Sequence, residues 1–368
     1  MNILILTAKC GMGHYQCAKA IREKIEASRM TSFIDRVDIV DIYEEKSCDK
    51  AKFFYKLYDL FVDRGNILYN YSYKQVKKKK EKQFILHWID KVFVENFEKI
   101  VVDRKPDLVI STYSFASELM SSYKEETGST IPLVTWITDV QPHAGWVNPC
   151  TDLYVVADQI SQKSLVAMGV ARDEIKIGGI PVLGRFDGAH GRRVGDKRRL
   201  LIMGGGLGLL PKDRKFYEAL DAAEDVEVSV VTGKNKELYA MLTHRFPEMR
   251  VYGYVKNVDE LMNDADILLT KAGGMTMFEA IQIEKPMLIF KPFLEQEVHN
   301  AAYIDAMHIG YVLPSNVKSA KDDVPIILGV LKNDAWLADM RTNLRRVKDA
   351  IDTRVVDDIL CFESRVLC

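Results

Sequence analysis

Two short apolar runs that each lead directly into a glycine-rich turn constrain the fold of this chain more than any other feature. The first run, Asn2–Thr7, is followed by AKCGMGH, and the second, Leu200–Met203, is followed by GGGLGLLP. Each opens a series in which short apolar runs alternate with longer amphipathic stretches. This alternation is typical of parallel sheets, because parallel neighbours must be joined by a helical crossover. The sequence therefore predicts two α/β halves of similar design.

Further apolar runs predict the other strands. In the first half they are 36–42, 108–111, 133–138 and 153–157, and in the second half 226–232, 250–254, 267–270 and 287–290. The polar, glycine-punctuated segment 186–199 is the predicted linker. With 368 residues, the chain is long enough for two ordinary domains. We place the first domain at residues 1–188, the second at 198–345, and a C-terminal helix that packs back on the first domain at 346–368.

Composition and charge exclude several classes of protein. Lys and Arg number 51 and Asp and Glu number 52, and this balance argues against a general nucleic-acid coat. No apolar run approaches the ~18 residues of a membrane span, and the N-terminus lacks the basic region of a signal peptide, so we expect a cytoplasmic location. The six cysteines form no C-x-x-C pair, so neither a zinc site nor a disulfide framework is predicted.

The first half carries an insert at residues 48–99 that is longer than a crossover between parallel strands needs. It is rich in aromatic residues and contains YKQVKKKKEK, with six lysines and one glutamate. A basic segment beside aromatic side chains is typical of proteins that lie on an anionic membrane. We therefore predict that Lys77, Lys78, Lys79 and Lys80 contact lipid headgroups. The simpler alternative is a solvated basic face.

Glycine-rich turns at predicted strand ends are candidate phosphate sites. Glycine lets the backbone approach a ligand, and the helix that follows offers free N–H groups. The first turn lacks the third glycine of a dinucleotide fingerprint, and GGGLG lacks the Lys-Ser/Thr of a P-loop, so neither a dinucleotide site nor an ATPase is favoured. The candidate residues of the three turns are Gly11, Gly13, Gly205, Gly206, Gly273, Gly274, Met275 and Thr276.

Polar side chains near these turns are candidates for contacts with a sugar nucleotide. Glu279 lies one helical turn beyond Met275, where a carboxylate could accept hydrogen bonds from both hydroxyls of a ribose. Gln296, Glu297 and Asn300 follow a predicted strand, and their amide and carboxylate groups suit sugar hydroxyls. The alternative for each is a solvated or capping residue.

Three residues that follow strands of the first half are candidate bases. His14 ends the first glycine-rich turn, and Asp139 and His143 lie in TDVQPHAGW at 138–146. An imidazole titrates near neutral pH and can accept a proton during catalysis. The sequence leaves open which of the three acts. The acidic pair at positions 264 and 266 is predicted to cap a strand, so no metal site is predicted.

Taken together and in this order, the motifs resemble glycosyltransferase family 28, in its branch of monogalactosyldiacylglycerol synthases and processive diacylglycerol glucosyltransferases. The resemblance covers nearly the whole chain. The segments that carry it are GMGH, TDVQPHAGW, GIPV at 179–182, GGGLG, TGKN at 232–235, GYV at 253–255, KAGGMTMFE at 271–279 and EQEVHN at 295–300. Glu295 stands where the family usually has glycine, which leaves the donor sugar open.

The resemblance implies a GT-B fold, in which two Rossmann-like domains face each other across a cleft. It implies an inverting enzyme that uses a UDP-sugar as co-substrate, without a cofactor or a metal. It also implies that the second half holds most of the donor and that His14 faces the acceptor. The implied donor contacts are Tyr254 and Val255 for uracil, Glu279 for ribose, the Gly273–Gly274 turn with Thr276 for diphosphate, and Gln296 and Glu297 for the sugar.

The expected function is the transfer of a hexose from a UDP-sugar to a lipid hydroxyl, that of diacylglycerol, to make a glycolipid. The expected partners are the UDP-sugar, the lipid acceptor and an anionic membrane surface on which the protein lies peripherally, with no nucleic acid. Three alternatives stay open: a polyprenyl or soluble acceptor, a UDP-sugar epimerase, and a non-enzymatic UDP-sugar sensor. The basic, aromatic insert argues against the epimerase.

Overall fold

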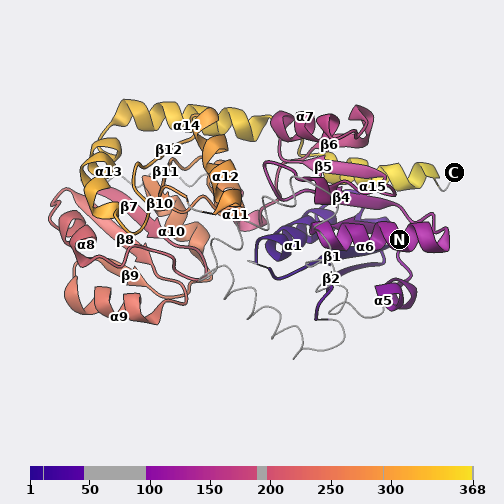
Figure 1. Cartoon of the computed structure of the whole chain (residues 1–368), viewed down its shortest axis with the longest axis horizontal. Coiled ribbons are helices and arrows are strands. Elements are labelled where there is room, and N and C mark those ends of the chain that lie inside the picture. The colour runs from indigo at the N-terminus through magenta and orange to yellow at the C-terminus, as the bar shows by residue number, and fades with distance from the viewer. Residues whose placement is uncertain (11, 45–96, 189–196, 293, 367–368) are drawn as a thin grey trace. The chain divides into compact units, whose positions relative to one another are not determined.

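The computed structural model describes residues 1–10, 12–44, 97–188, 197–292 and 294–366 (Figure 1). The predicted membrane residues Lys77–Lys80 and the turn residue Gly11 lie outside the described residues. The chain divides into two compact units: Met1–Gly184 together with Ile351–Cys368, and Arg185–Ala350. The divisions predicted from the sequence lie close by, at residues 188 and 346.

The first unit is built on a six-stranded parallel sheet in the order β2-β1-β3-β4-β5-β6. Ile3 of β1 lies opposite Val37 on one side and Leu108 on the other. The central strands are buried throughout except for Asn2, the first residue of β1, as their apolar sequences predict. The strands are β1 (Asn2–Thr7), β2 (Arg36–Asp41), β3 (Leu108–Ser111), β4 (Leu133–Trp136), β5 (Leu153–Val156) and β6 (Ile175–Ile177).

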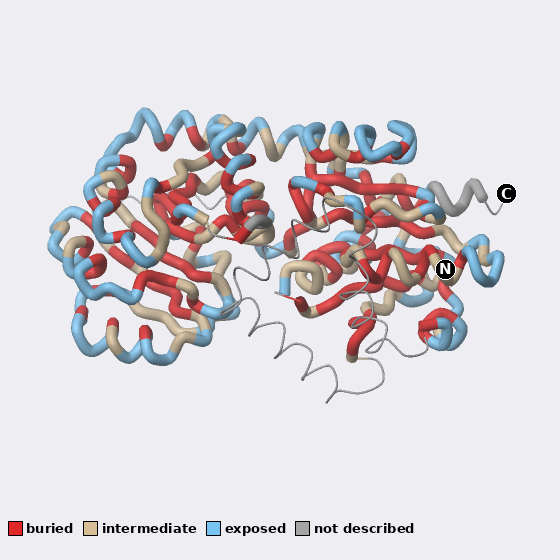
Figure 2. Tube along the Cα trace, in the orientation of Figure 1, coloured by how far each residue is buried: buried red, intermediate tan, exposed pale blue. Residues whose placement is uncertain are grey.

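Helices cover this sheet and bury their apolar faces against it (Figure 2). They are α1 (Gly13–Glu26), α5 (Phe97–Arg104), α6 (Ser114–Thr127), α7 (Gln159–Ala167) and α15 (Val355–Val366). α15 returns to the first unit from the end of the chain, where Ser28 Oγ donates to Asp357 and Lys176 pairs with Asp358 at 2.7 Å. Gly178 permits this packing, because a Cβ there would lie 2.8 Å from Val355.

The second unit repeats the design with a six-stranded parallel sheet in the order β12-β11-β10-β7-β8-β9. Its strands are β7 (Arg198–Met203), β8 (Val226–Val231), β9 (Arg250–Tyr252), β10 (Ile267–Thr270), β11 (Met287–Ile289) and β12 (Gly310–Val312). Its helices are α8 (Arg214–Asp221), α9 (Lys236–Arg245), α10 (Val258–Asp264), α11 (Gly274–Gln282), α12 (Glu295–Ala306), α13 (Val324–Leu331) and α14 (Asp334–Asp349). Asp213, Asn235 and Asn333 cap α8, α9 and α14 by accepting backbone hydrogen bonds, which fixes where these helices begin.

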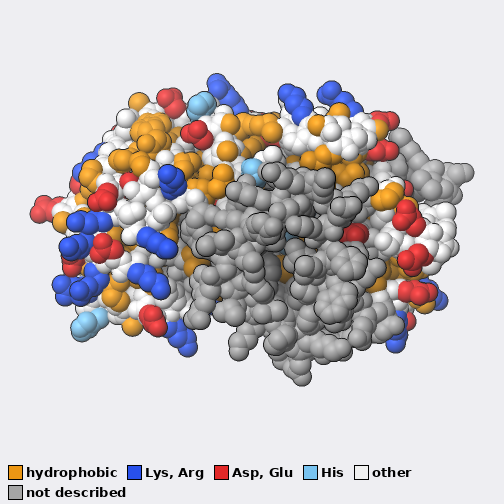
Figure 3. Space-filling view, viewed as in Figure 1, with side chains coloured by type: hydrophobic (Ala, Val, Ile, Leu, Met, Phe, Trp, Pro, Cys, Tyr) orange, Lys and Arg blue, Asp and Glu red, His pale blue; other side chains and the backbone are white. Residues whose placement is uncertain are grey.

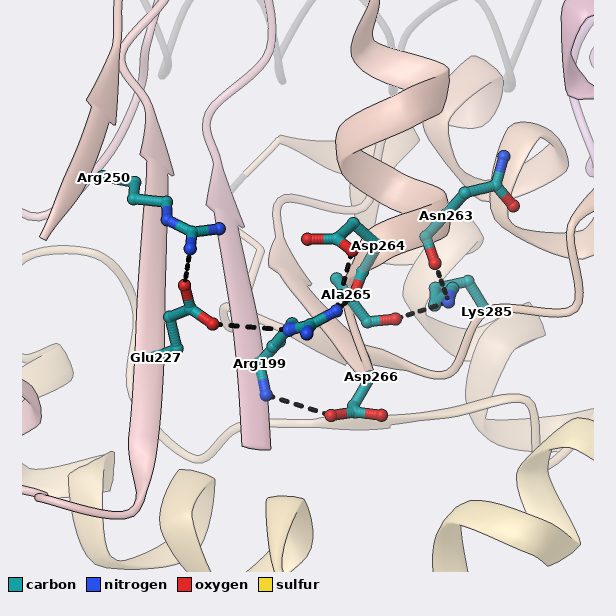
Figure 4. Close-up of polar contacts among 8 residues, drawn as sticks. All are labelled: Arg199, Glu227, Arg250, Asn263, Asp264, Ala265, Asp266 and Lys285. Atoms are coloured by element: carbon teal, nitrogen blue, oxygen red, sulfur yellow. Dashed lines mark hydrogen bonds and ion pairs between the residues drawn. The ribbon is translucent and has the colours of Figure 1, made fainter. Parts of the chain in front are cut away.

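A network of charged side chains ties together the amino ends of β7, β8 and β10 (Figure 4). The guanidinium of Arg199 pairs with Glu227 at 3.3 Å and with Asp264 at 2.7 Å, and Glu227 also pairs with Arg250. The Asp266 carboxylate accepts from the backbone N–H of Arg199 at 3.0 Å. Asp264 and Asp266 therefore both have structural partners. These contacts lie at the amino ends of the strands, whereas the glycine-rich turns follow the carboxyl ends.

Charged side chains of both signs are interspersed over the second unit on the face that Figure 3 shows. This mixed surface agrees with the nearly balanced charge of the sequence. Among the described residues, no helix is both long enough and apolar enough to cross a membrane. The same part of the chain contains no group of three or more His, Cys, Asp or Glu side chains arranged to hold a metal ion.

Candidate active site

The glycine loop after β7, residues 204–208, has a shape that depends on glycine. Gly205 and Gly208 have φ angles of 68° and 67°. A Cβ on Gly208 would lie 1.9 Å from the carbonyl oxygen of Thr232. Lys234 N donates to Gly206 O at 3.0 Å, so the loop rests on residues 232–235. Gly206 itself is exposed, and a Cβ there would meet open space. The backbone of the loop is therefore accessible at Gly206.

Lys271, directly after β10, contacts α12 and lies close to this loop. Its Nζ lies 3.0 Å from Oε1 of Glu297 on α12, and a Cβ on Gly205 would lie 3.2 Å from its Cε. Asn300 on α12 donates to the carbonyl of Ala272 at 2.9 Å. Glu297 and Asn300 are both buried. These contacts gather residues from the carboxyl ends of β7, β10 and β11, where ligands bind in open parallel sheets.

The first turn of α11 offers backbone N–H groups without a competing side chain. Gly273 is the N-cap residue and Gly274 begins the helix, and among the described residues no side chain caps this end. Met275 and Thr276 follow and are partly exposed. An uncapped helix N-terminus combines free donors with the positive end of the helix dipole, which suits a phosphate.

Glu279 lies two residues beyond the first turn of α11 and is partly buried. Burial raises the pKa of its carboxyl group to about 7, while the positive charge of Arg185 acts in the opposite direction and Asp259 adds to the rise. Tyr254 and Val255 lie in the loop after β9, where Tyr254 is 63% exposed. The exposed ring of Tyr254 and the carboxylate of Glu279, whose pKa is perturbed, are each candidates for contacts with a nucleoside.

Gln296 lies in the first turn of α12, but its side chain and that of Glu295 are outside the described residues. The other predicted donor residues of the second unit lie on the loop after β7, the start of α11, the loop after β9 and α12. Lys271 and Arg185 were missed by sequence reasoning. For Lys271, its position shortly before the Gly273–Gly274 turn could have indicated a role in the site. No sequence pattern pointed to Arg185.

His14, the second residue of α1, is held through Nδ1. The carbonyl oxygen of Thr112 lies 2.9 Å and the hydroxyl oxygen of Thr138 2.8 Å from this nitrogen. Because a carbonyl oxygen only accepts, Nδ1 carries the hydrogen in the neutral ring and Nε2 keeps its lone pair. Burial lowers the pKa of His14 below its ordinary value, although the charge of Asp139 opposes this. Near neutral pH the ring is therefore a proton acceptor at Nε2.

Asp139 and His143 lie beside His14 but are engaged differently. Trp146 Nε1 donates to Asp139 Oδ2 at 2.8 Å, and the backbone N–H of Gly145 donates to Nδ1 of His143 at 3.1 Å. In neutral His143 the hydrogen is therefore on Nε2, which lies 3.9 Å from Asp139 Oδ2. The rings of His14 and His143 stand 6.4 Å and 6.0 Å from that of Trp146. The structure thus gathers the three predicted residues around one buried tryptophan.

The turn before α1 holds an unusual backbone conformation. Met12 precedes Gly13 and has φ 65°, and its side chain is 43% exposed. A non-glycine residue in this left-handed region costs about 1–3 kcal/mol, and such strain is concentrated at functional sites. This left-handed conformation could not be predicted from the sequence, because methionine is not a residue that favours this region.

Comparison with known proteins adds family models that match both halves. Residues 14–182 match the model described as monogalactosyldiacylglycerol (MGDG) synthase, and residues 200–353 match the glycosyltransferase family 28 C-terminal domain. The chain is 28% identical over 379 residues to a processive diacylglycerol beta-glucosyltransferase of Bacillus licheniformis, covering 100% of this chain and 96% of the relative. The protein of the same description from Bacillus subtilis is 28% identical over 381 residues, with the same coverage.

Solved structures of the same architecture cover almost the entire chain. MurG of Acinetobacter baumannii matches with a TM-score of 0.64 at 14% identity, over 98% of this chain and 99% of that chain. The spinosyn rhamnosyltransferase SpnG complexed with thymidine diphosphate matches with a TM-score of 0.60 at 15% identity, over 95% and 96%. With the two parallel sheets, these likenesses confirm the predicted α/β fold class of GT-B type.

Proposed function

This chain belongs to glycosyltransferase family 28, and we propose that it transfers a hexose from a UDP-sugar to the hydroxyl of diacylglycerol. The observation that carries the proposal is the similarity, over the whole chain, to relatives described as processive diacylglycerol beta-glucosyltransferases. The product would be a glycolipid with the configuration at the anomeric carbon inverted.

The proposed donor site lies in the second unit. Uracil would contact Tyr254 and Val255, and the ribose hydroxyls would donate to Glu279. The diphosphate would lie against the N-terminus of α11 and the exposed backbone of Gly206, and the sugar against α12. The contacts of Lys271 with α12 and the glycine loop support this grouping. The full set of proposed donor residues is Gly11, Gly13, Gly205, Gly206, Tyr254, Val255, Gly273, Gly274, Met275, Thr276, Glu279, Gln296, Glu297 and Asn300.

In the proposed reaction the acceptor hydroxyl attacks the anomeric carbon. A bond forms between the acceptor oxygen and that carbon, the bond from the carbon to the diphosphate oxygen breaks, and UDP leaves with the electron pair. His14 takes the hydroxyl proton on Nε2, the nitrogen that its contact with Thr112 leaves as an acceptor. The N–H groups that begin α11 and the ammonium of Lys271 would stabilise the charge that develops on UDP. We propose that no metal or cofactor takes part.

The proposed function is tested with purified protein, UDP-glucose, UDP-galactose and UDP-N-acetylglucosamine, each with diacylglycerol, a polyprenyl phosphate or no acceptor. We expect a diacylglycerol hexoside by mass spectrometry, with inverted configuration by NMR, both with and without EDTA. A changed UDP-sugar without acceptor would instead support an epimerase. Binding of UDP-sugars with no turnover on any acceptor would support a sensor.

The pH dependence of UDP binding should report the carboxyl group of Glu279. Hydroxyls of ribose donate best to the ionised form, whereas burial raises the pKa of Glu279 to about 7 in the unliganded protein. Because ionisation of Glu279 favours UDP, UDP should bind about tenfold more weakly at about pH 6 than at about pH 8, and binding should release a proton near neutral pH. Calorimetry in buffers of different ionisation enthalpy measures both. Glu279→Gln should bind weakly with no such slope, and an equal slope in that variant would contradict the assignment.

Membrane association through Lys77–Lys80 stays a prediction, because these residues lie outside the described part of the chain. Each lysine near an anionic surface contributes about 1 kcal/mol, so replacing all four with Gln should weaken sedimentation with anionic vesicles strongly. UDP binding should be unchanged. Native binding should also weaken as salt rises, because screening shortens the reach of the charges. Equal sedimentation with anionic and neutral vesicles would mean that the lysines form only a solvated face.

A further inference from the structure

Arg185 contacts two segments of the second unit that are distant from it in sequence. It is the first residue of that unit, in the short 3₁₀ helix Gly184–Phe186. Its Nη1 donates to the carbonyl oxygen of Lys256 at 2.6 Å, and its Nε lies 3.5 Å from Oδ1 of Asp259 in the first turn of α10. Lys256 directly follows Val255. The hydrogen bond therefore holds the end of the loop that is proposed to flank the base.

The position of Arg185 is itself set by its neighbours. Its guanidinium lies 5.3 Å from the centre of the Phe186 ring, and Phe186 is fully buried. Asp187 accepts a hydrogen bond at 2.8 Å from the side chain of Gln282, the last residue of α11. The segment that carries Arg185 is thus tied to the helix that carries Glu279.

Two neighbouring charged side chains shift the pKa of the Glu279 carboxyl group in opposite directions. Arg185 favours its charged form and Asp259 disfavours it. α14 also packs against α11, but its Arg345 and Lys348 pair with Glu284, beyond the end of α11. Among the described residues, Arg185 is therefore the cation that favours the ionised carboxylate, the form that accepts hydrogen bonds from hydroxyls.

We propose that Arg185 is a positioning residue of the nucleotide site, which anchors the loop after β9 through the carbonyl of Lys256 and places a positive charge near the carboxylate of Glu279. This inference rests on the proposed function, because it assigns Arg185 a part in holding the base and ribose of UDP. Arg185 acts through Lys256 and Glu279 and does not itself touch the ligand.

Three variants separate the two effects of Arg185. Arg185→Met removes the charge and the hydrogen bond, whereas Arg185→Lys keeps the charge but loses the planar fork. Arg250→Met is the matched control, because Arg250 begins β9, the strand that leads into the same loop, and pairs with Glu227. UDP binding is measured by calorimetry from about pH 5.5 to about pH 8.5, which spans the titration of Glu279.

We expect Arg185→Met to bind UDP roughly tenfold more weakly even at about pH 8.5, where Glu279 is ionised. Its affinity should also begin to fall at a higher pH than in the wild type, by on the order of one pH unit. Arg185→Lys should bind more weakly but keep the wild-type pH profile. Arg250→Met should match the wild type in both affinity and profile.

A second measurement follows Glu279 without any ligand. Carboxyl ¹³C signals of glutamate-labelled protein are titrated, and the Glu279 signal is assigned by its loss in Glu279→Gln. Arg185→Met should raise the pKa of Glu279 by a shift similar to that seen in the UDP profile. An unchanged Glu279 titration and an unchanged UDP affinity in Arg185→Met would overturn the inference and leave the proposed function standing. A wild-type protein that binds no UDP at any pH would overturn the proposed function, and the role of Arg185 with it.

Discussion

Replacing His14 with Ala should lower kcat by roughly 10²–10⁴-fold, the loss expected when a general base is removed. The reason is the position of the hydrogen on the neutral imidazole ring of His14. The carbonyl of Thr112 fixes the hydrogen on Nδ1 and leaves Nε2 to accept the proton of the acceptor hydroxyl. UDP affinity should change little, because His14 belongs to the first unit and the proposed donor residues with described side chains lie mainly in the second.

The pH profile offers an independent check of the same assignment. A base must be unprotonated to act, and burial lowers the pKa of His14 below its ordinary value. The acid limb of kcat should therefore lie below about pH 6.5, the ordinary value for an imidazole. Activity should be lost as pH falls through the lowered pKa and should be present above it.

His143→Gln is the matched control for His14→Ala. His143 accepts from the backbone of Gly145 through Nδ1, so its neutral ring carries the hydrogen on Nε2, which leaves no free lone pair for a substrate proton. We expect its kcat to fall less than tenfold, through disturbance of the contacts around Trp146. A larger loss in His143→Gln than in His14→Ala would move the role of the base to His143 or to its neighbour Asp139.

The strands for which both ends were predicted correctly are those with continuous apolar runs. β1, β3 and β10 begin and end where the runs do, because a strand buried on both faces needs apolar residues throughout. β6 and β12 were missed. Each has only three residues, and their partly exposed positions leave no run to detect. They are strands because β5 and β11 supply a parallel partner.

In the candidate site, too, features set by neighbouring residues could be predicted from the sequence, whereas contacts between distant residues could not. Glycine-rich turns are local patterns, and the sequence indicated them. The hydrogen on Nδ1 of His14 depends on Thr112, which is 98 residues away, and the anchoring of the loop after β9 depends on Arg185, 71 residues from Lys256. No spacing rule connects residues so far apart in the sequence, so these contacts could be identified only from the folded structure.

At two glycines of the loop after β7, the same substitution should have different effects on the stability of the protein. Gly208→Ala should destabilise the protein by roughly 1–3 kcal/mol, because Gly208 has φ 67° and its Cβ would lie 1.9 Å from the carbonyl oxygen of Thr232. The loop must move to relieve that contact, so UDP affinity should fall as well. Thermal unfolding and calorimetry measure the two losses.

Gly206→Ala should leave stability unchanged or raise it by up to about 1 kcal/mol, because alanine restricts the unfolded chain and a Cβ there meets open space. If the diphosphate lies against this backbone, the added methyl occupies the space of a phosphate oxygen. UDP affinity should then fall roughly tenfold or more, while affinity for uridine, which has no phosphate, stays at the wild-type value.

The pair separates a glycine that shapes the loop from one that contacts the ligand. Gly208→Ala lowers both stability and UDP affinity, whereas Gly206→Ala lowers the affinity for the phosphorylated ligand without lowering stability. Wild-type UDP affinity in Gly206→Ala would show that the diphosphate does not approach this loop. The N-terminus of α11 with Lys271 would then be the remaining phosphate site in the second unit, since an uncapped helix end and an ammonium can bind a diphosphate without the loop.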